Sequence, residues 1–139
     1  MRGFFKCCVA LLFLSNVVRA QNWLWSKPQN ITSAAYLKGN IRSGNSGNLV
    51  SYLTENSSTH LVFTDAYGNV IWNRFYSGLV IQDVMVDSYD NIYFAGSFSG
   101  QVAISDRTFT SQGNSDAIIG MLDKNAALIK TNTIGGENE

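Results

Sequence analysis

Short runs of apolar and β-branched residues, separated by turn-forming residues, follow one another along most of this chain. Runs rich in Val, Ile, Tyr and Phe and bounded by Gly, Asn, Asp and Ser are typical of β-strands. No stretch after the first 20 residues shows sustained helical periodicity. The pattern therefore predicts an all-β chain, with strands at 22–27, 34–41, 49–54, 59–64, 70–76, 81–86, 92–98, 101–104, 108–110, 117–122 and 128–134.

Turn chemistry marks the ends of these strands. Asp65 to Asn69 and Asp123 to Ala127 have the Asp, Asn and Gly composition that short antiparallel connections need. Asp87, Asp90 and Asn91 favour a tight reversal just before the strand at 92–98, because Asp and Asn hydrogen-bond their own backbone and tolerate left-handed conformations.

Two of the predicted strands are apolar almost without interruption. They are 84–86 (Val-Met-Val) and 117–122 (Ala-Ile-Ile-Gly-Met-Leu). A strand with one solvent-exposed face should alternate between apolar and polar residues. These runs therefore predict stacked sheets that are covered on both faces.

The second half of the chain repeats features of the first half. An offset of 58 pairs Asp65 with Asp123 and Gly78 with Gly136, and it also pairs Asn56 with Asn114 and Ile71 with Ile129. An offset of 57 pairs Tyr36 with Tyr93 and Gly39 with Gly96. One insertion near Asn56 would reconcile the two offsets.

One complete unit of the repeat runs from residue 81 to about residue 136. It contains strand, turn, strand, a small excursion at 101–110, strand, Asp-centred turn and strand. This order predicts a four-stranded antiparallel sheet, which is the blade of a β-propeller. We therefore expect an all-β fold of four-stranded antiparallel β-propeller-type blades, about two of them, in an incomplete propeller.

The same unit resembles a known repeat family. The similarity is carried by Val84-Met85-Val86-Asp87, Asn91-Ile92-Tyr93-Phe94-Ala95-Gly96-Ser97-Phe98-Ser99-Gly100, Gly113-Asn114-Ser115-Asp116-Ala117, Leu122-Asp123 and Gly135-Gly136-Glu137-Asn138. These residues look like the SBBP-type β-propeller repeat, which occurs in exported bacterial proteins, notably from Bacteroidetes. Residues 81–139 match well and residues 34–78 match loosely. The resemblance implies a propeller fold and a secreted or surface location, but no defined activity.

The chain departs from that family in two ways. Its first unit lacks a counterpart of the strand at 81–86, so one strand is expected to be missing. Two blades are also fewer than the roughly 4 to 8 that close a propeller. We therefore expect the front piece of a longer protein or a truncated gene product, with an N-terminal strand and an incomplete first blade at 21–80 and a second blade at 81–139. The strand at 22–27 would complete the last blade of the longer protein.

The first 20 residues have the organisation of a secretory signal peptide. Arg2 and Lys6 form a basic start, residues 7–14 form a short apolar core, and Ala20 ends a segment with small residues at the cleavage positions. Cleavage is expected between Ala20 and Gln21. The apolar run is shorter than the roughly 20 residues of a membrane-spanning helix. These features predict a secreted or cell-surface protein, bacterial in source, with no membrane insertion after processing.

Processing would also change the chemistry of the chain. Both cysteines lie in the signal peptide, so the remaining chain would have neither a disulfide nor a thiolate metal site. The formal charge of the full chain is zero, and loss of three basic side chains leaves a mildly acidic protein without a basic cluster. We therefore expect no nucleic-acid partner. No motif calls for a cofactor.

The titratable residues offer few candidates for catalysis or metal binding. Asp83, Asp87 and Asp90 are close in sequence, but Ile92 occupies the position where an EF-hand loop needs glycine. Turn formation is the favoured interpretation of these aspartates, and the same holds for Asp65 and Asp123. His60 is the only histidine and has no sequence partner, so we expect a partly buried strand residue. There is no G-x-S-x-G motif.

Aromatic residues offer the one candidate binding surface. Core packing and strand propensity account for most of them, but a platform that stacks on sugar rings is an alternative. Its best members are Tyr67 and Tyr89, because both fall in predicted loops. The other aromatics considered for it are Trp23, Trp25, Tyr36, Trp72 and Phe75.

These observations favour one function and leave a second open. The favoured one is an exported, non-enzymatic β-propeller repeat segment that acts as a structural or binding module, with an unknown protein or glycan as its partner. Such a segment would need further blades or self-association to cover its outer faces. The alternative is the N-terminal part of a secreted enzyme whose catalytic residues lie outside this chain.

Overall fold

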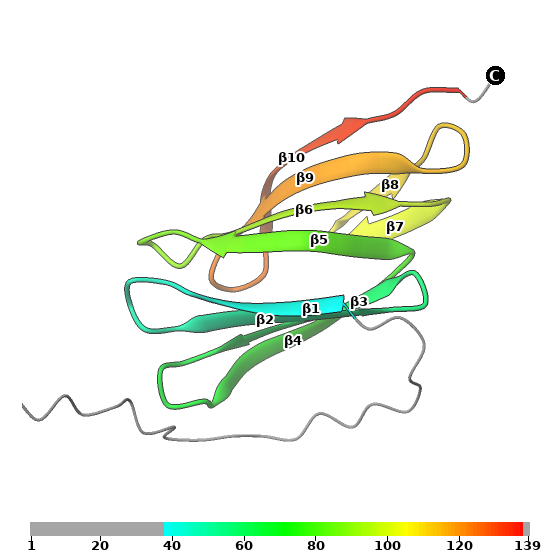
Figure 1. Cartoon of the computed structure of the whole chain (residues 1–139). Helices are drawn as coiled ribbons and strands as arrows, with labels where there is room; N and C mark the ends of the chain where they lie inside the picture. Colours follow the sequence, from blue (N-terminus) through cyan, green and yellow to red (C-terminus); the bar gives the residue numbers. More distant parts are fainter. Residues whose placement is uncertain (1–37, 138–139) are drawn as a thin grey trace, which may run out of the picture.

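The structure, a computed structural model, describes residues 38–137, which consist of β-strands joined by turns and loops (Figure 1). The first sheet, which we call sheet A, is an antiparallel meander in the order β1-β2-β3-β4. Its strands are β1 (Lys38–Ser43), β2 (Leu49–Glu55), β3 (Ser58–Thr64) and β4 (Val70–Ser77). The all-β class and the four-stranded antiparallel sheets predicted from the sequence are confirmed.

The second sheet, sheet B, is also four-stranded and antiparallel, in the order β5-β6-β9-β10. Between β6 and β9 the chain makes a separate two-stranded hairpin, which corresponds to the predicted excursion. The strands of sheet B are β5 (Leu79–Val86), β6 (Ile92–Phe98), β9 (Asp116–Leu122) and β10 (Leu128–Ile134), and those of the hairpin are β7 (Gln101–Ile104) and β8 (Arg107–Thr110).

The two sheets are built to the same plan. The turn between β1 and β2 (residues 44–48) has the same two backbone hydrogen bonds as the turn between β5 and β6 (residues 87–91), at an offset of 87 − 44 = 43 residues. In the second half of each sheet the offset is 58, and both sheets carry a bulge at the equivalent residues Ile71 and Ile129. The offsets differ because the β7–β8 hairpin is inserted between β6 and β9, whereas β2 and β3 are joined by the two residues 56 and 57.

This plan corrects the repeat expected from sequence. Sheet A has all four strands, so no strand is missing from the first unit, and β1 is the counterpart of β5. The pairing of Gly39 with Gly96 is wrong, because Gly39 lies in the edge strand β1 and Gly96 lies in the central strand β6. Of the expected strand at 34–41, residues 38–41 lie in β1, and residues 34–37 lie outside the described part of the chain. Tyr36 and the predicted strand at 22–27 lie outside the described residues.

One face of each sheet forms the shared core. We call the face of sheet A that meets sheet B its front face, and the face of sheet B that meets sheet A its back face. The core residues of the front face are Val50, Tyr52, Leu61, Phe63, Trp72 and Tyr76, and those of the back face are Leu79, Ile81, Val84, Ile92, Phe94, Phe98, Ile118 and Leu122. Val102 and Ile104 of β7 also belong to this cluster.

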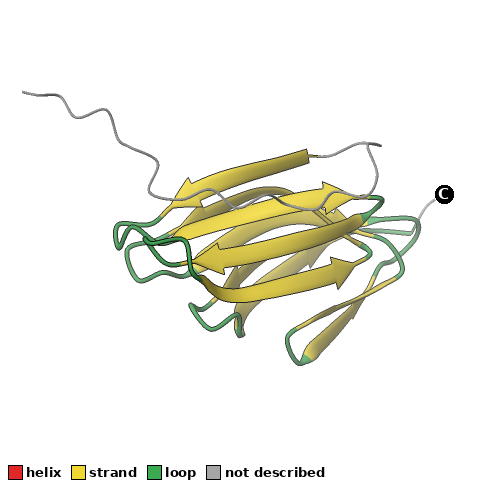
Figure 2. Ribbon diagram, turned by 90° about the horizontal axis from the view of Figure 1, so that it is seen from below, coloured by secondary structure: helices red, strands yellow, loops and turns green. Residues whose placement is uncertain are grey.

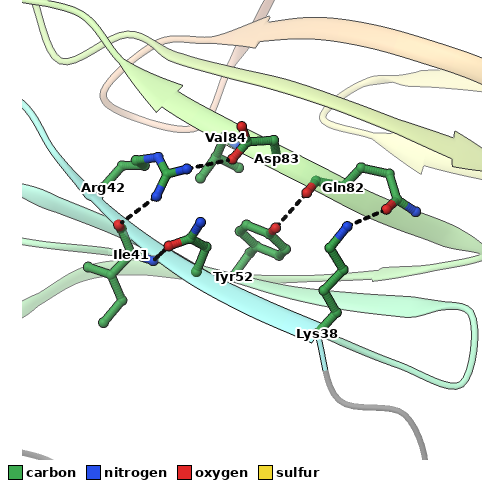
Figure 3. A network of polar contacts seen from close by, with 8 residues as sticks. Lys38, Ile41, Arg42, Tyr52, Gln82, Asp83 and Val84 are labelled. Atoms are coloured by element: carbon green, nitrogen blue, oxygen red, sulfur yellow. Dashed lines mark hydrogen bonds and ion pairs between the residues drawn. The ribbon is translucent and has the colours of Figure 1, made fainter.

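Strand β5 is the part of sheet B that lies closest to sheet A (Figure 1). The hydroxyl of Tyr52 donates to the carbonyl oxygen of Gln82 at 2.6 Å, and the hydroxyl of Thr59 donates to the carbonyl oxygen of Leu79 at 2.7 Å. At the rim, Lys38 bonds Gln82 and Arg42 pairs with Asp83 at 3.2 Å (Figure 3). Front-face side chains of sheet A therefore satisfy backbone groups on the edge strand of sheet B.

The outer faces of the pair are open within residues 38–137. Strand β9 alternates, with Ile118 and Leu122 buried on the back face but Ile119 54% exposed on the other side. Met85 of β5 is likewise exposed. The expectation that the apolar strands are covered on both faces is therefore not met by the described residues, which cover one face only. They form two stacked sheets and no closed ring.

Candidate functional site

Four five-residue turns gather at one end of the two sheets (Figures 1 and 2). In each of them the N–H of the first residue donates to the carbonyl of the fifth, and the N–H of the fourth donates to the carbonyl of the first. The fourth residue has positive φ in every case: Gly47, Gly68, Asp90 and Ala126. We call this surface the turn end, made of residues 44–48, 65–69, 87–91 and 123–127.

Aspartate fixes the shape of three of these turns. One carboxylate oxygen of Asp65 accepts the N–H groups of Tyr67 and Asn69 at 2.9 and 2.8 Å, and the other accepts the Asn69 side chain at 2.8 Å. Asp87 makes the same three contacts. Asp123 makes only the two backbone contacts, because Ala127 replaces the asparagine. The aspartates therefore act as turn formers, as the sequence indicated.

Two tyrosines stand at equivalent places in this frame. Tyr67 and Tyr89 are the third residues of the second and third turns, and their side chains are 77% and 80% exposed. The backbone N–H of each is held by the aspartate two residues before it. Each ring is thus carried on a fixed backbone and is free for contact with another molecule.

The first turn lies between the two tyrosine-bearing turns. A methyl group built on Gly47 would lie 3.2 Å from the Ala66 side chain, and one on Gly44 would lie 3.1 Å from the carboxylate of Asp90. Ser46 and Asn48 donate to the two oxygens of that carboxylate at 2.5 and 2.9 Å. The turn end therefore presents a polar, internally bonded strip flanked by two aromatic rings.

The electrostatics of the turn end favour ionised aspartates. The hydrogen bond from the Asn69 side chain, with help from backbone N–H groups, lowers the pKa of Asp65 below its ordinary value. Partial burial opposes ionisation of Asp87, but hydrogen bonds from Asn91, Tyr89 and Tyr93 outweigh it and lower its pKa as well. The turns thus carry fixed negative charge at neutral pH.

The other residues that the sequence offered as candidates for catalysis or metal binding do not come together at one site. Asp83 pairs with Arg42, Asp87 closes its turn, and Asp90 accepts hydrogen bonds from the first turn. His60 lies in β3 as expected, but it is exposed rather than partly buried, with its ring 4.7 Å from the ring of Phe75. Among residues 38–137, no three His, Cys, Asp or Glu side chains are placed to hold a metal ion.

The remaining repeat positions lie in the strands of sheet B or close to the end of a strand, outside the turn end. Gly78 joins the two sheets with φ of 80°, and Gly136 follows β10. Gly96 sits beneath the carbonyl of Val80, and Tyr93 faces outward beside Met121. The expected cleavage position, Ala20 to Gln21, and Trp23 and Trp25 lie outside the described residues.

Sequence reasoning missed two links between the turn end and the core. The indole of buried Trp72 donates to the carbonyl of Lys124 at 2.9 Å, which ties sheet A to the fourth turn. The hydroxyl of Ser105 donates to the carbonyl of Ala126 at 2.8 Å. Neither residue carries a motif, and these partners are 52 and 21 positions apart, so no local signal points to them.

Comparison with family models and with curated proteins adds no relative to this picture. No family model matches the chain, and a search of curated proteins finds none that matches it. The resemblance to the SBBP-type repeat therefore stays a prediction. Within residues 38–137, no helix is long and apolar enough to cross a membrane.

Proposed function

We propose that this chain is an exported, non-enzymatic repeat module of the β-propeller type that binds a glycan or a protein surface through its turn end. The proposal of a propeller-type repeat is supported by two sheets of one plan, stacked front to back, with a short link at Gly78 between the last strand of one and the first of the next. Export is proposed from the signal-peptide pattern of residues 1–20.

The observation that carries the binding proposal is the pair Tyr67 and Tyr89. Both rings are more than three-quarters exposed, so neither contributes much to the core. A tyrosine ring offers an apolar face and a polar tip, and it loses little conformational entropy on binding. Two such rings beside a strip of Ser, Asn and Asp groups suit a ligand with both C–H faces and hydroxyls, such as an oligosaccharide.

A glycan array probed with the purified chain tests this proposal. Replacement of both rings in the double variant Y67A/Y89A should reduce binding about 5- to 150-fold, because two aromatic contacts of roughly 0.5–1.5 kcal/mol each contribute about 1–3 kcal/mol. The matched control is Phe75→Ala, which removes an aromatic side chain that is 58% exposed on the outer face of sheet A rather than at the turn end.

The control variant should bind like the unmodified chain. An array that stays blank for the unmodified chain would remove the carbohydrate ligand, and a pull-down with exported proteins of the same source would then test the protein ligand. Equal binding by the double variant and the unmodified chain would show that the turn end is not the site.

A further inference from the structure

The outer face of sheet B has apolar residues at the positions that correspond to those by which sheet A packs against sheet B. We call this outer face the front face of sheet B. Strand register places Tyr93, Ile119, Met121 and Ile134 where sheet A has Val50, Leu61, Phe63 and Tyr76. The four residues of sheet A are at most 6% exposed, whereas Ile119 and Ile134 are 54% and 63% exposed. Within residues 38–137, sheet B therefore has the apolar positions of a packing face that no other described sheet covers.

The front face of sheet B is also hollowed. A shallow groove of about 220 Å³ runs along β9 and β10 and is lined by Tyr93, Ile119, Met121, Lys130, Thr131 and Asn132. Large apolar side chains normally avoid such exposure, and contiguous apolar patches mark interaction surfaces. The uninterrupted apolar sequence of β9 fits the same conclusion, because it suits a strand that is covered on both sides.

The opposite end of the stack offers a matching surface, the back face of sheet A. Its exposed Ile41 stands at the position of Val84, which is buried against sheet A in the observed pair. Leu49, Leu53 and Val62 on the same face are only partly covered. Within residues 38–137, one copy thus carries an open front face on sheet B and an open, largely apolar back face on sheet A.

We propose that copies of this chain associate head to tail, with the front face of sheet B of one copy on the back face of sheet A of the next. The contact repeats the arrangement that joins the two sheets inside one chain, so it is heterologous rather than symmetric. The pairing of faces rests on the observed stack. Closure into a ring rests on the proposed propeller-type geometry, in which about 4 to 8 sheets complete a circle, or about two to four chains.

One polar contact of the internal interface has a counterpart in this arrangement. Trp72 donates to the carbonyl of Lys124 in the fourth turn. Lys130 stands at the position of Trp72, and Ala66 of the second turn stands at the position of Lys124. The Lys130 ammonium group would therefore meet the 65–69 turn of the next copy, which contains the carboxylate of Asp65.

Other contacts of the internal interface are not repeated. Ala95 and Ala117 replace Tyr52 and Thr59, so two hydroxyl donors to the edge strand are absent. The contact between copies should accordingly be weaker than the contact between sheets in one chain. A dissociable assembly follows, whose mass depends on protein concentration.

Two variants and their mixture test this arrangement by sedimentation equilibrium. Ile119→Asp places a charge on the front face of sheet B, and Ile41→Asp places one on the back face of sheet A. Both side chains are more than half exposed in the single chain, so each variant should fold. Circular dichroism and a cooperative melt check this, and Tyr89→Ser at the turn end is the control that leaves both faces intact.

The unmodified chain and the control should form a discrete oligomer of about two to four chains that dissociates on dilution. Each face variant alone should be monomeric, and the equimolar mixture should form a one-to-one dimer, because one intact front face then meets one intact back face. A monomeric unmodified chain at high concentration would overturn the proposal. Association of Ile41→Asp alone would also overturn it, since that result indicates a symmetric front-to-front contact.

A further comparison uses the chain shortened to start at Lys38. It should oligomerise as the unmodified chain does. If only the shortened chain formed oligomers and the longer chain were monomeric, the proposal would be contradicted. That result would mean that residues 21–37 cover one of the two faces. If Y67A/Y89A lost glycan binding but kept the oligomer mass of the unmodified chain, the binding site and the contact between copies would be shown to be independent.

Discussion

Single carboxylates fix the turns that carry the proposed binding surface. Asp65 and Asp87 each accept two backbone N–H groups and one asparagine side chain. These turns were predictable from sequence, because Asp and Asn at the first and fifth positions have a known preference for such hydrogen bonds. The role of Asp90 was not, since its partners Ser46 and Asn48 lie more than 40 positions away.

The turn aspartates should make the protein sensitive to acid. The pKa values of Asp65 and Asp87 are lowered in the folded chain, so the folded state binds protons less readily than the unfolded state. Their stabilising effect is complete above a pH of about 4 and is lost as the pH falls through the lowered pKa values. The urea midpoint should therefore decrease as the pH falls below about 4.

Asp87→Asn should make that decrease smaller, because the variant has one carboxylate fewer to protonate. Tyr89→Ala keeps the carboxylate in the same turn and should retain the pH dependence of the unmodified chain. Equal slopes for Asp87→Asn and Tyr89→Ala would show that the Asp87 hydrogen bonds do not produce the acid sensitivity.

Two glycines of the repeat have opposite surroundings. A methyl group on Gly96 would lie 2.3 Å from the carbonyl oxygen of Val80, at the bulge where β5 meets β6. Nothing lies within 4 Å of the same position on Gly136. Gly96→Ala should therefore destabilise the fold by about 1–3 kcal/mol. Gly136→Ala should change stability by less than about 0.5 kcal/mol. Denaturant melts that rank the two variants in the opposite order would contradict the account.

At the scale of elements, the sequence predicted the limits of the strands better than it predicted which strand of sheet A is equivalent to which strand of sheet B. Most described strands begin and end within one or two residues of the predicted limits, because turn residues mark their ends. The sequence Lys-Gly-Asn-Ile-Arg-Ser of β1 has no apolar alternation and is almost wholly exposed, so its end was predicted two residues early, at residue 41 instead of Ser43. Residue identities then aligned Gly39 with Gly96. The true correspondence lies in the hydrogen bonds of the turns and in the bulges at Ile71 and Ile129.

Thr59 should be central to the junction between the two sheets. Its buried hydroxyl donates to the carbonyl of Leu79 at 2.7 Å and accepts the N–H of Ile81 at 3.1 Å. Thr59→Val keeps the shape of the side chain and removes both bonds together with the 2.9 Å hydrogen bond between the hydroxyls of Thr59 and Thr54, which should cost about 1–3 kcal/mol. Thr59→Ser keeps the hydroxyl and loses only a methyl group, which should cost about 1 kcal/mol. Equal urea midpoints for Thr59→Val and the unmodified chain would contradict this role.

At the scale of the whole molecule, the two sheets share one core and present two different kinds of surface. The turn end is polar and carries Tyr67 and Tyr89, whereas the front face of sheet B is apolar. The sequence indicated that the apolar strands should be covered on both faces, and the described residues cover one. Because coverage of the second face depends on a further sheet, it was not derivable from the local pattern of one strand.

The front-to-back stacking of two equivalent sheets is the central claim, since both the turn end and the open face depend on it. Nuclear Overhauser contacts in solution measure it most directly. The stacking predicts contacts between the indole of Trp72 and residues 124–126, and between the ring of Tyr52 and Gln82. Strong contacts within each sheet but none between these pairs would contradict it.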